Sequence, residues 1–525
     1  MTNRDNMKKI LRLTIDGKDL NRIRNLRYVR EMSSQRATSG NVGSIYFDTP
    51  DQQLAARNVV IEVRKVEQRY VQSVCATGPK LDGVRVRRLH WENPLPTPEP
   101  DPGAVGDANL RALATPSPGS LLKPVLHCRV HRSTRQLLTP KRRSVRFVLE
   151  NVEFTSTDDF PIFTNIILDS RSADGAAPFD VALGIHAKVP LRVATISRES
   201  AALQALGGGL TWRKAVPLDL PREANVEDTL VHILHHCLDH LTDNEQITRL
   251  SDHPEGVHQM RVAMRRLRSA LRIFRDVMPL EQYLRVTDEI KWQTKNLGDT
   301  RDLDVFMDEI VGPVAAAMDG EPAFSALLKR LAVDRDNART AAQKEIDNPR
   351  FTEFLLQTLG WIEGRKWRNR RAAEPTALLG QPIIELSDKL LSKRFKKVRK
   401  QGRIFDTLSV DEKHQLRIDV KKLRYATDFF SSLYGYERVS GFIASLQKLQ
   451  DGLGYMNDLA VAGNLVAHLV KTSPRSTVGA VAHAGALVMG WHSHAAQEAT
   501  RNLAEDVARL LACKRFWSTG NEAEK

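Results

Sequence analysis

The hydrophobic pattern divides the chain into two parts. Up to about Leu206, short runs rich in Val, Ile and Leu are separated by turn residues, and several alternate with a period of two, which is typical of antiparallel strands. From Val226 onward, hydrophobic residues recur every three or four positions, as on amphipathic helices. The pattern predicts an α+β chain with an antiparallel β barrel or sandwich followed by an all-α domain. The expected strands are residues 10–15, 44–47, 59–65, 70–76, 125–130, 144–149 and 164–168.

Glycine and proline mark the boundary between these parts. Three glycines at positions 207–209 end the β part, and a proline-containing stretch follows before helix signals resume at Val226. We therefore predict a β domain over residues 1–206, a linker over 207–225 and a helical domain over 226–525.

One predicted helix, residues 258–274, carries almost only cations on its polar face. Its sequence is HQMRVAMRRLRSALRIF, and there is no acid between Val257 and Arg275. At about 100° per residue, five of its basic side chains fall within roughly 80° of one another. Like charges so close disfavour a helix unless something neutralises them, so the stripe predicts an anionic ligand. The five are His258, Arg261, Arg265, Arg268 and Arg272, and Arg266 lies beside them.

A second copy of this stripe begins at His414 and reads HQLRIDVKKLRYATDFF. The offset is 414 minus 258, or 156, and it continues without a gap into two Leu-Gly segments, at Leu297 and Leu453. Such similarity indicates an internal duplication, with repeats over about 226–380 and 381–525. The second copy supplies His414, Arg417, Lys421, Lys422 and Arg424 as candidate ligand-binding residues.

A third basic stretch directly precedes the second copy. No acid lies between Asp388 and Asp406. Such a run alone is most often solvated or a nucleic-acid patch, but its position predicts an extension of the same surface. Its candidates are Lys389, Lys393, Lys396, Lys397, Lys400 and Arg403.

The doubled motif of His, then Arg at +3, Arg or Lys at +7 and +8, and Leu-Arg at +9 and +10 resembles the CHAD family, the conserved-histidine α-helical domain. The resemblance covers roughly residue 225 to the end. It implies two pseudo-symmetric helical bundles whose basic face binds inorganic polyphosphate, and accumulation on polyphosphate granules. The residue pattern itself indicates only a polyanion.

The first domain is similar to the CYTH family in its strand order, in the Tyr-Phe-Asp-Thr-Pro segment ending at Pro50, and in its position before a CHAD-like domain. That resemblance implies an antiparallel tunnel for triphosphate and divalent metal, which a Glu-x-Glu pair on the first strand binds. Here no glutamate precedes Glu31, and the strand reads KKILRLTI. Because Mg²⁺ requires oxygen ligands, we expect no metal, no cofactor and no enzymatic activity. Cations for a tunnel remain, although a solvated strand face explains them more simply: Arg64, Lys65, Arg85, Arg87, Arg129 and Arg132.

Other residues leave alternatives open. A histidine group is compatible with a metal site, although a structural role is favoured: His232, His235, His236 and His240. Asp302 and Asp304 are expected to cap a helix or to pair with the basic stripe rather than to bind metal. Nucleic acid is the alternative partner, but single-strand binders need exposed aromatic rings. Phe274, Phe395 and Phe430 are expected in the core, which leaves Trp361 and Trp367 as stacking candidates.

Composition supports an anionic partner without choosing one. The formal net charge is +15, and the four cysteines show no metal-ligand spacing. The longest apolar run, residues 478–491, is shorter than the roughly 20 residues that a membrane span needs. We therefore predict a cytoplasmic protein without a membrane span that binds a polyanion, which the CHAD resemblance implies to be polyphosphate. A protein partner docked on the β domain is compatible with this prediction. Triphosphate hydrolysis by the β domain is a further alternative.

Overall fold

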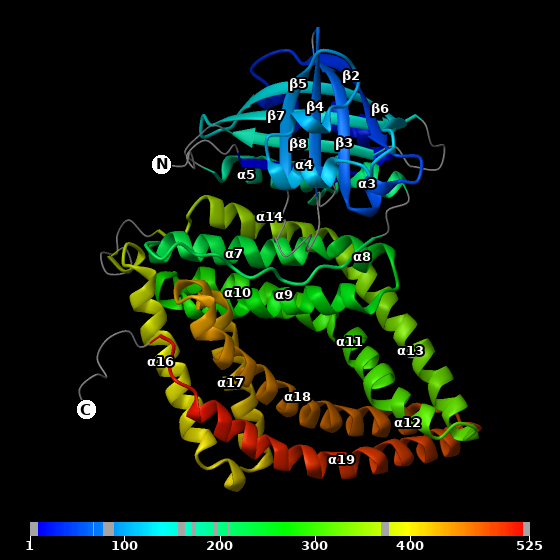
Figure 1. Ribbon diagram of the computed structural model, residues 1–525, viewed down its shortest axis with the longest axis vertical. Helices are drawn as coiled ribbons and strands as arrows, with labels where there is room; N and C mark the ends of the chain where they lie inside the picture. Colours follow the sequence, from blue (N-terminus) through cyan, green and yellow to red (C-terminus); the bar gives the residue numbers. More distant parts are fainter. Residues whose placement is uncertain are drawn as a thin grey trace. The chain divides into compact units, whose positions relative to one another are not determined.

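The computed structural model describes residues 9–66, 68–76, 89–155, 163–170, 175–193, 198–206, 210–368 and 377–517 (Figure 1). The chain forms two compact units. The sheet unit comprises Met1–Arg213 and Asn348–Lys366, and the helical unit comprises Lys214–Asp347 and Trp367–Lys525.

The sheet unit is built on one antiparallel sheet, which confirms the expected β domain. Its described strands hydrogen-bond in the order β5-β4-β3-β2-β6-β7-β8-β1-β9. Alternating side chains give each strand two different faces, so Leu11 and Leu13 of β1 are buried while Arg12 between them is half-buried. The strands are β1 (Lys9–Ile15), β2 (Thr38–Asp48), β3 (Val59–Val66), β4 (Arg69–Ala76), β5 (Leu89–Leu95), β6 (Lys123–Leu138), β7 (Ser144–Phe154), β8 (Phe163–Ser170) and β9 (Arg192–Val193).

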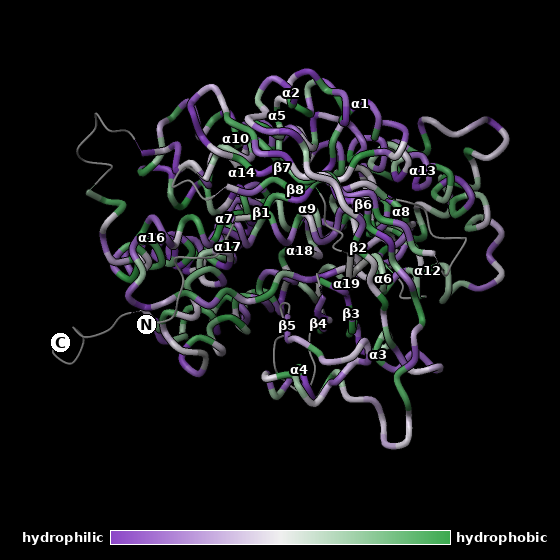
Figure 2. Tube along the Cα trace, turned by 90° about the horizontal axis from the view of Figure 1, so that it is seen from above, coloured by the Kyte–Doolittle hydropathy of each residue, from purple (hydrophilic) through white to green (hydrophobic). Residues whose placement is uncertain are grey.

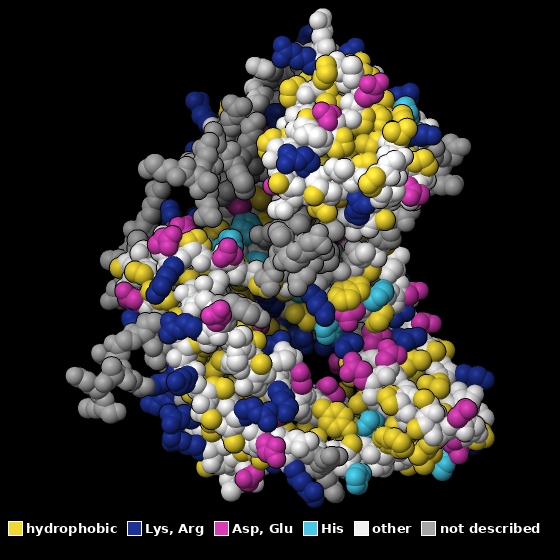
Figure 3. Space-filling model, viewed as in Figure 1, with side chains coloured by type: hydrophobic (Ala, Val, Ile, Leu, Met, Phe, Trp, Pro, Cys, Tyr) yellow, Lys and Arg dark blue, Asp and Glu magenta, His cyan; other side chains and the backbone are white. Residues whose placement is uncertain are grey.

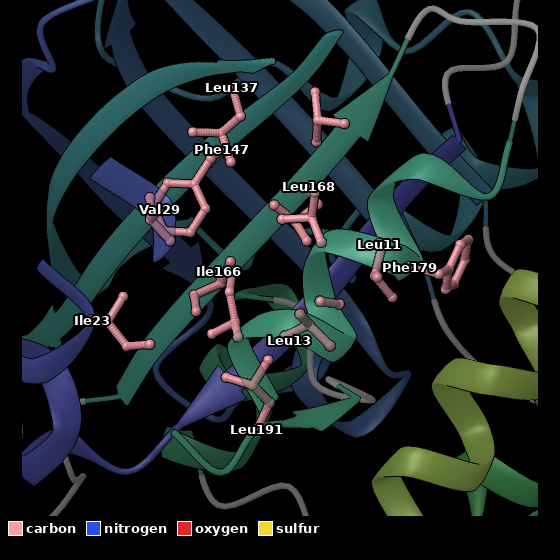
Figure 4. Close-up of a cluster of buried hydrophobic side chains, with 14 of the residues drawn as sticks. Leu11, Leu13, Ile23, Val29, Leu137, Phe147, Ile166, Leu168, Phe179 and Leu191 are labelled. Atoms are coloured by element: carbon pink, nitrogen blue, oxygen red, sulfur yellow. The ribbon is translucent and has the colours of Figure 1, made fainter. Parts of the chain in front are cut away.

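Short helices cover the sheet. α5 packs on β8 and places Phe179 and Ile185 in a core with Leu13, Phe147 and Leu168 (Figure 4). A second core lies under α3 and α4, and a third includes Ala202 of α6. The helices are α1 (Leu20–Arg24), α2 (Arg27–Met32), α3 (Gln53–Ala56), α4 (Ala108–Ala114), α5 (Ala177–His186) and α6 (Arg198–Ala205).

One further helix of the sheet unit, α14 (Pro349–Glu363), comes from the middle of the predicted helical domain. Leu356 joins the core under α5, and a side chain at Gly360 would lie 2.9 Å from the Cβ of Phe179. Glycine therefore permits the close approach of α14 to α5. The boundary predicted at residue 226 had placed this helix with the second domain.

The helical unit contains α7 to α13 and α16 to α19. Hydropathy changes every few residues along α16 and α17, as expected where one side of a helix faces a core (Figure 2). None of the described helices combines the length and apolarity needed to cross a membrane. The helices are α7 (Val226–Asp243), α8 (Glu245–Leu250), α9 (Pro254–Ile273), α10 (Leu280–Asn296), α11 (Gly298–Val305), α12 (Gly312–Ala317), α13 (Pro322–Asp347), α16 (Ile383–Gly402), α17 (Val410–Phe430), α18 (Tyr436–Thr472) and α19 (Val478–Ala512).

The two motif helices are α9 and α17, and each has a defined start. Pro254 occupies the first turn of α9, where its missing N–H costs nothing, and the His253 ring accepts a hydrogen bond from the Glu255 amide. At α17, Ser409 and Glu412 form a reciprocal capping box. α9 packs against α7 and α17, and α17 packs against α16 and α18. The duplicated stripes therefore meet within one unit.

Candidate anion-binding site

The site lies where α9 and α17 pack together. Their apolar faces are buried, including Met264 and Leu267 of α9 and Leu423 of α17. Arg265 comes from α9, while Arg417 and Lys421 lie one turn apart on α17. Figure 3 shows a hollow in the helical unit whose rim carries Lys and Arg side chains together with acidic and His side chains. We call Arg265, Arg417 and Lys421 the inner cluster.

The inner cluster is cationic and lacks counter-charges in direct contact. Within the described part of the chain, none of its three side chains makes a hydrogen bond or an ion pair, and no group accepts from the buried Nε of Arg265 or of Arg417. Unpartnered buried donors are uncommon in folded proteins. Two arginines with such donors, beside a lysine that has no partner among the described residues, indicate a surface suited to an anion.

Electrostatics confirm that the three side chains are neighbours. Burial first, and then the charges of Arg417, Arg265 and Arg424 against the opposing charge of Asp458, lower the pKa of Lys421 to about 8. Burial likewise lowers the pKa of Arg417, and Arg265 adds to this effect against the opposing charge of Asp458. The cations of the inner cluster therefore destabilise one another in the ligand-free protein.

Three arginines border the inner cluster, and each has an acidic partner. Arg261 lies 3.5 Å from Asp302, Arg301 lies 3.0 Å from Glu309, and Arg424 lies 3.8 Å from Asp428. The predicted pairing of Asp302 with the basic stripe is confirmed. Asp304 of α11 instead lies 3.7 Å from Arg339 of α13. The stripe is thus partly neutralised at its edge and unneutralised at its centre.

The repeat explains how the edge arginine is positioned. Arg261 donates to the carbonyl oxygen of Leu297 at 2.9 Å and approaches Asp302. Adding the 156-residue offset gives Arg417, Leu453 and Asp458, and the charge of Asp458 acts on Arg417. The Leu-Gly segment with its aspartate is therefore the part of the repeat that faces the motif arginine.

The two motif histidines lie in different environments. His258 is half-buried, whereas His414 is exposed. Burial lowers the pKa of His258 to about 4, and Arg301, Arg265 and Arg261 contribute to this while Glu255 opposes it. His258 is consequently neutral at physiological pH in the ligand-free protein, so it can accept one hydrogen bond and donate another.

Arg266 must be removed from the predicted binding surface. Only 5% of it is exposed, its guanidinium lies over the ring of Phe429 at 5.4 Å, and one Nη lies 3.4 Å from His236. Arg266 follows Arg265 by about 100° around the helix and so turns inward. It connects α9 with α7 and α17 in the core.

Lys422 and Lys397 also lie away from the inner cluster. Both pair with the buried carboxylate of Asp419, at 3.0 and 2.9 Å. Although burial alone would raise the pKa of Asp419, hydrogen bonds from Lys397, Gln401, Gln415 and Lys422 hold it well below the usual range. Lys397 therefore joins α16 to α17 through Asp419, whereas Lys422 pairs with Asp419 within α17.

The remaining predicted cations form an exposed set, which we call the outer row. These side chains lie on α9 and α16 and at the end of α16. Arg394 connects the outer row to α17 by donating to the carbonyl oxygen of Lys422, and burial together with the charge of Arg272 lowers its pKa to about 10. The outer row comprises Arg268, Arg272, Lys389, Lys393, Lys396, Lys400 and Arg403.

Arg301 and Arg394 were not predicted as site residues. Arg301 belongs to α11, and its closeness to His258 follows from the fold rather than from spacing within a motif. Arg394 stands inside the basic stretch of α16 but on the side opposite most of its lysines, so its helical position could have revealed it.

The stacking alternative loses support, and two histidines of the predicted group make contacts within the helical unit. Trp361 and Trp367 are each only 1% exposed, so neither ring presents a face to a base. Phe274, Phe395 and Phe430 are buried as expected. His236 contacts Arg266, and His240 contacts Gln259 at 3.1 Å. Among the described residues, no three His, Cys, Asp or Glu side chains are grouped for a metal ion.

The arginines of the sheet unit face carboxylates that the sequence did not identify. Arg64 lies 2.7 Å from Glu92, and Arg132 lies 2.6 Å from Glu150, which is 1% exposed. Arg129 lies 3.7 Å from Glu153, while Lys65 is exposed. Arg85 and Arg87 lie outside the described residues. Three of the four described cations predicted for a tunnel are therefore paired within the sheet.

Comparisons with known proteins agree with the helical part. The family model "CHAD domain" matches residues 232–467. The crystal structure of the CHAD domain from the plant Ricinus communis is 26% identical, with a TM-score of 0.50, and the match covers 57% of this chain and 97% of that one. No curated protein matches the chain.

Two further solved structures match with lower scores. PptA from Streptomyces chartreusis is 16% identical with a TM-score of 0.39, covering 54% of this chain and 99% of that one. A Hippeastrum protein described as an adenylyl cyclase with a dominant triphosphatase activity is 13% identical with a TM-score of 0.27, covering 38% of this chain and 96% of that one.

Proposed function

Because residues 232–467 form a CHAD domain, we propose that this protein binds inorganic polyphosphate without changing it chemically. The observation that carries the proposal is the inner cluster, in which cations from both repeats converge without acidic partners in direct contact. A chain of phosphoryl groups supplies many equivalent anionic oxygens, so it can satisfy all three side chains at once.

The residue types suit this ligand. Arginine donates forked, charge-assisted hydrogen bonds to phosphate, and lysine adds a compact charge. The half-buried setting makes each contact stronger than it would be in bulk water. From the inner cluster the chain would continue over the outer row, where exposed lysines hold it more weakly and in a salt-dependent manner.

The test compares polyphosphate affinity in wild type with Arg265→Gln/Arg417→Gln. We expect at least a roughly 100-fold loss, since two charge-assisted contacts at about 1.5–3 kcal/mol each are removed. Arg285→Gln/Arg475→Gln removes the same charge from exposed positions of the helical unit and should change affinity less than about threefold. Equal losses in the two variants would show that only net charge matters and would refute the proposal.

Nucleic acid serves as the competitor in this test. Because the candidate stacking rings of Trp361 and Trp367 are buried, single-stranded RNA should bind more weakly than polyphosphate at matched ionic strength. For enzymatic activity, phosphate release from tripolyphosphate with Mg²⁺ or Mn²⁺ is the assay, and we expect none. In cells, we expect the protein on cytoplasmic polyphosphate granules, which fluorescence localisation would check.

A further inference from the structure

Lys421 is placed unlike its neighbour Lys422. The Lys421 side chain is half-buried, and within the described residues it makes no hydrogen bond or ion pair. The charged groups that act on it are Arg417 and Arg424 from α17, Arg265 from α9 and Asp458 from α18. Lys422, one position along the same helix, donates to Asp419 at 3.0 Å. The two lysines form a natural pair for comparison.

These surroundings favour the neutral amine of Lys421. Burial and three adjacent guanidinium groups bring its pKa to about 8, so a substantial fraction carries a free lone pair at physiological pH. A neutral amine is a nucleophile, and a lysine whose pKa is lowered by neighbouring cations is a known form of activated nucleophile. The same guanidinium groups are suited to hold a phosphate next to it.

We propose that Lys421 is a modification site that is acylated by small acyl phosphates and that this acylation switches the inner cluster off. Arg265 and Arg417 would hold the phosphate portion of the donor beside the amine. The regulatory half of this proposal rests on the proposed function, whereas the reactivity of Lys421 does not.

The chemistry needs no further reactant. The lone pair of Nζ forms a bond to the carbonyl carbon of the acyl phosphate, and the bond from that carbon to the phosphate oxygen breaks. Inorganic phosphate leaves with the electron pair, and the amine proton passes to it or to water. The product is an amide, so the Lys421 side chain loses its positive charge and its ability to pair with phosphate.

The experiment incubates the full chain with acetyl phosphate at pH 7.5 and measures acetylation of Lys421 and Lys422 by site-resolved mass spectrometry. We expect Lys421 to react at least about tenfold faster, because an ordinary lysine is almost fully protonated at this pH. The rate at Lys421 should level off above about pH 8, where the amine is mostly neutral. Equal rates at the two lysines would overturn the proposal.

A phosphate-free reagent separates reactivity from docking. N-acetoxysuccinimide should also prefer Lys421, but by a smaller factor than acetyl phosphate does. Arg265→Gln/Arg417→Gln should abolish the excess seen with acetyl phosphate, and tripolyphosphate should protect Lys421 in the wild type. If the excess survives in the variant, the phosphate does not dock on the inner cluster and that part of the proposal fails.

The switch is tested through binding. Acetylated wild type and Lys421→Gln should each bind polyphosphate about tenfold more weakly, whereas Lys421→Arg should bind normally and resist acetylation. Unchanged affinity after acetylation would refute the switch. If wild type does not bind polyphosphate yet Lys421 still reacts selectively, the proposed function fails while the modification site stands.

Discussion

Two arginines of the inner cluster differ in their partners from the arginines of the sheet unit. In the sheet unit, Arg132 points at the buried carboxylate of Glu150, and Arg146 pairs with Asp169. In the helical unit, Arg265 and Arg417 have no acid in contact among the described residues. A buried charge costs free energy unless it is paired. In the sheet unit the carboxylates offset this cost, whereas in the inner cluster it is not offset until an anion binds. The difference identifies which of these arginines are already paired with carboxylates and which remain available to an anion.

The comparison predicts that equivalent substitutions in the two units change stability differently. Arg132→Gln leaves Glu150 buried without its charged partner and should lower the free energy of unfolding of the sheet unit by about 2 kcal/mol. Arg265→Gln removes a cation that Arg417 and Lys421 repel, so it should not lower the free energy of unfolding of the helical unit. Thermal unfolding followed for each unit measures both. Similar losses in the two variants would contradict the distinction, and Arg132→Gln should leave polyphosphate binding unchanged.

A smaller effect is expected on the pH dependence of binding. Bound polyphosphate favours the charged form of Lys421, so binding above about pH 8 must be accompanied by uptake of a proton. Polyphosphate affinity should therefore fall by about tenfold between pH 7.5 and 9.5. Lys421→Arg keeps its charge over this range and should flatten the profile, whereas Lys422→Arg should retain it. Calorimetric titrations at several pH values would measure this dependence. If the affinity of Lys421→Arg falls with pH as steeply as that of the wild type, Lys421 is not the cause of the pH dependence.

The smallest predicted effect is the change in stability of the helical unit that Lys421 causes. Since its pKa is lower in the folded protein than the ordinary value near 10.4, its protonated form opposes folding at pH 7, and stability should rise as the pH increases from about 8 toward 10. Lys421→Met should stabilise the helical unit by about 1 kcal/mol at pH 7, after allowance for solvent screening. This gain should vanish near pH 10. Lys422→Met, which takes a partner from Asp419, should destabilise instead.

The sequence predicted the elements well because their periodicity is local. The motif helix predicted over residues 258–274 is α9, Pro254–Ile273, and the antiparallel strands lie close to the predicted runs. The 156-residue offset also identified the two helices that come together. The sequence does not show which way a side chain points on a helix that is packed on several sides. For this reason Arg266 was assigned to the surface, although it is buried.

Contacts between distant segments were beyond the sequence. The membership of α14 in the sheet unit depends on the fit of Gly360 against Phe179, and Arg301 reaches His258 only because α11 folds back along α9. Glu150 was overlooked because strand alternation shows which residues share a face but not which strand lies opposite. Charge composition indicated a polyanion, and only tertiary structure separated the inner cluster from the outer row.

The inner cluster takes Arg265 from the first copy of the duplicated motif and Arg417 and Lys421 from the second. A ligand seated there would bridge the copies and act as a non-covalent cross-link between them. Pulling the halves apart would then require releasing the ligand, so occupancy should make the two repeats unfold together. In that state, a polymer that the chain does not encode would form part of what holds its two halves in place.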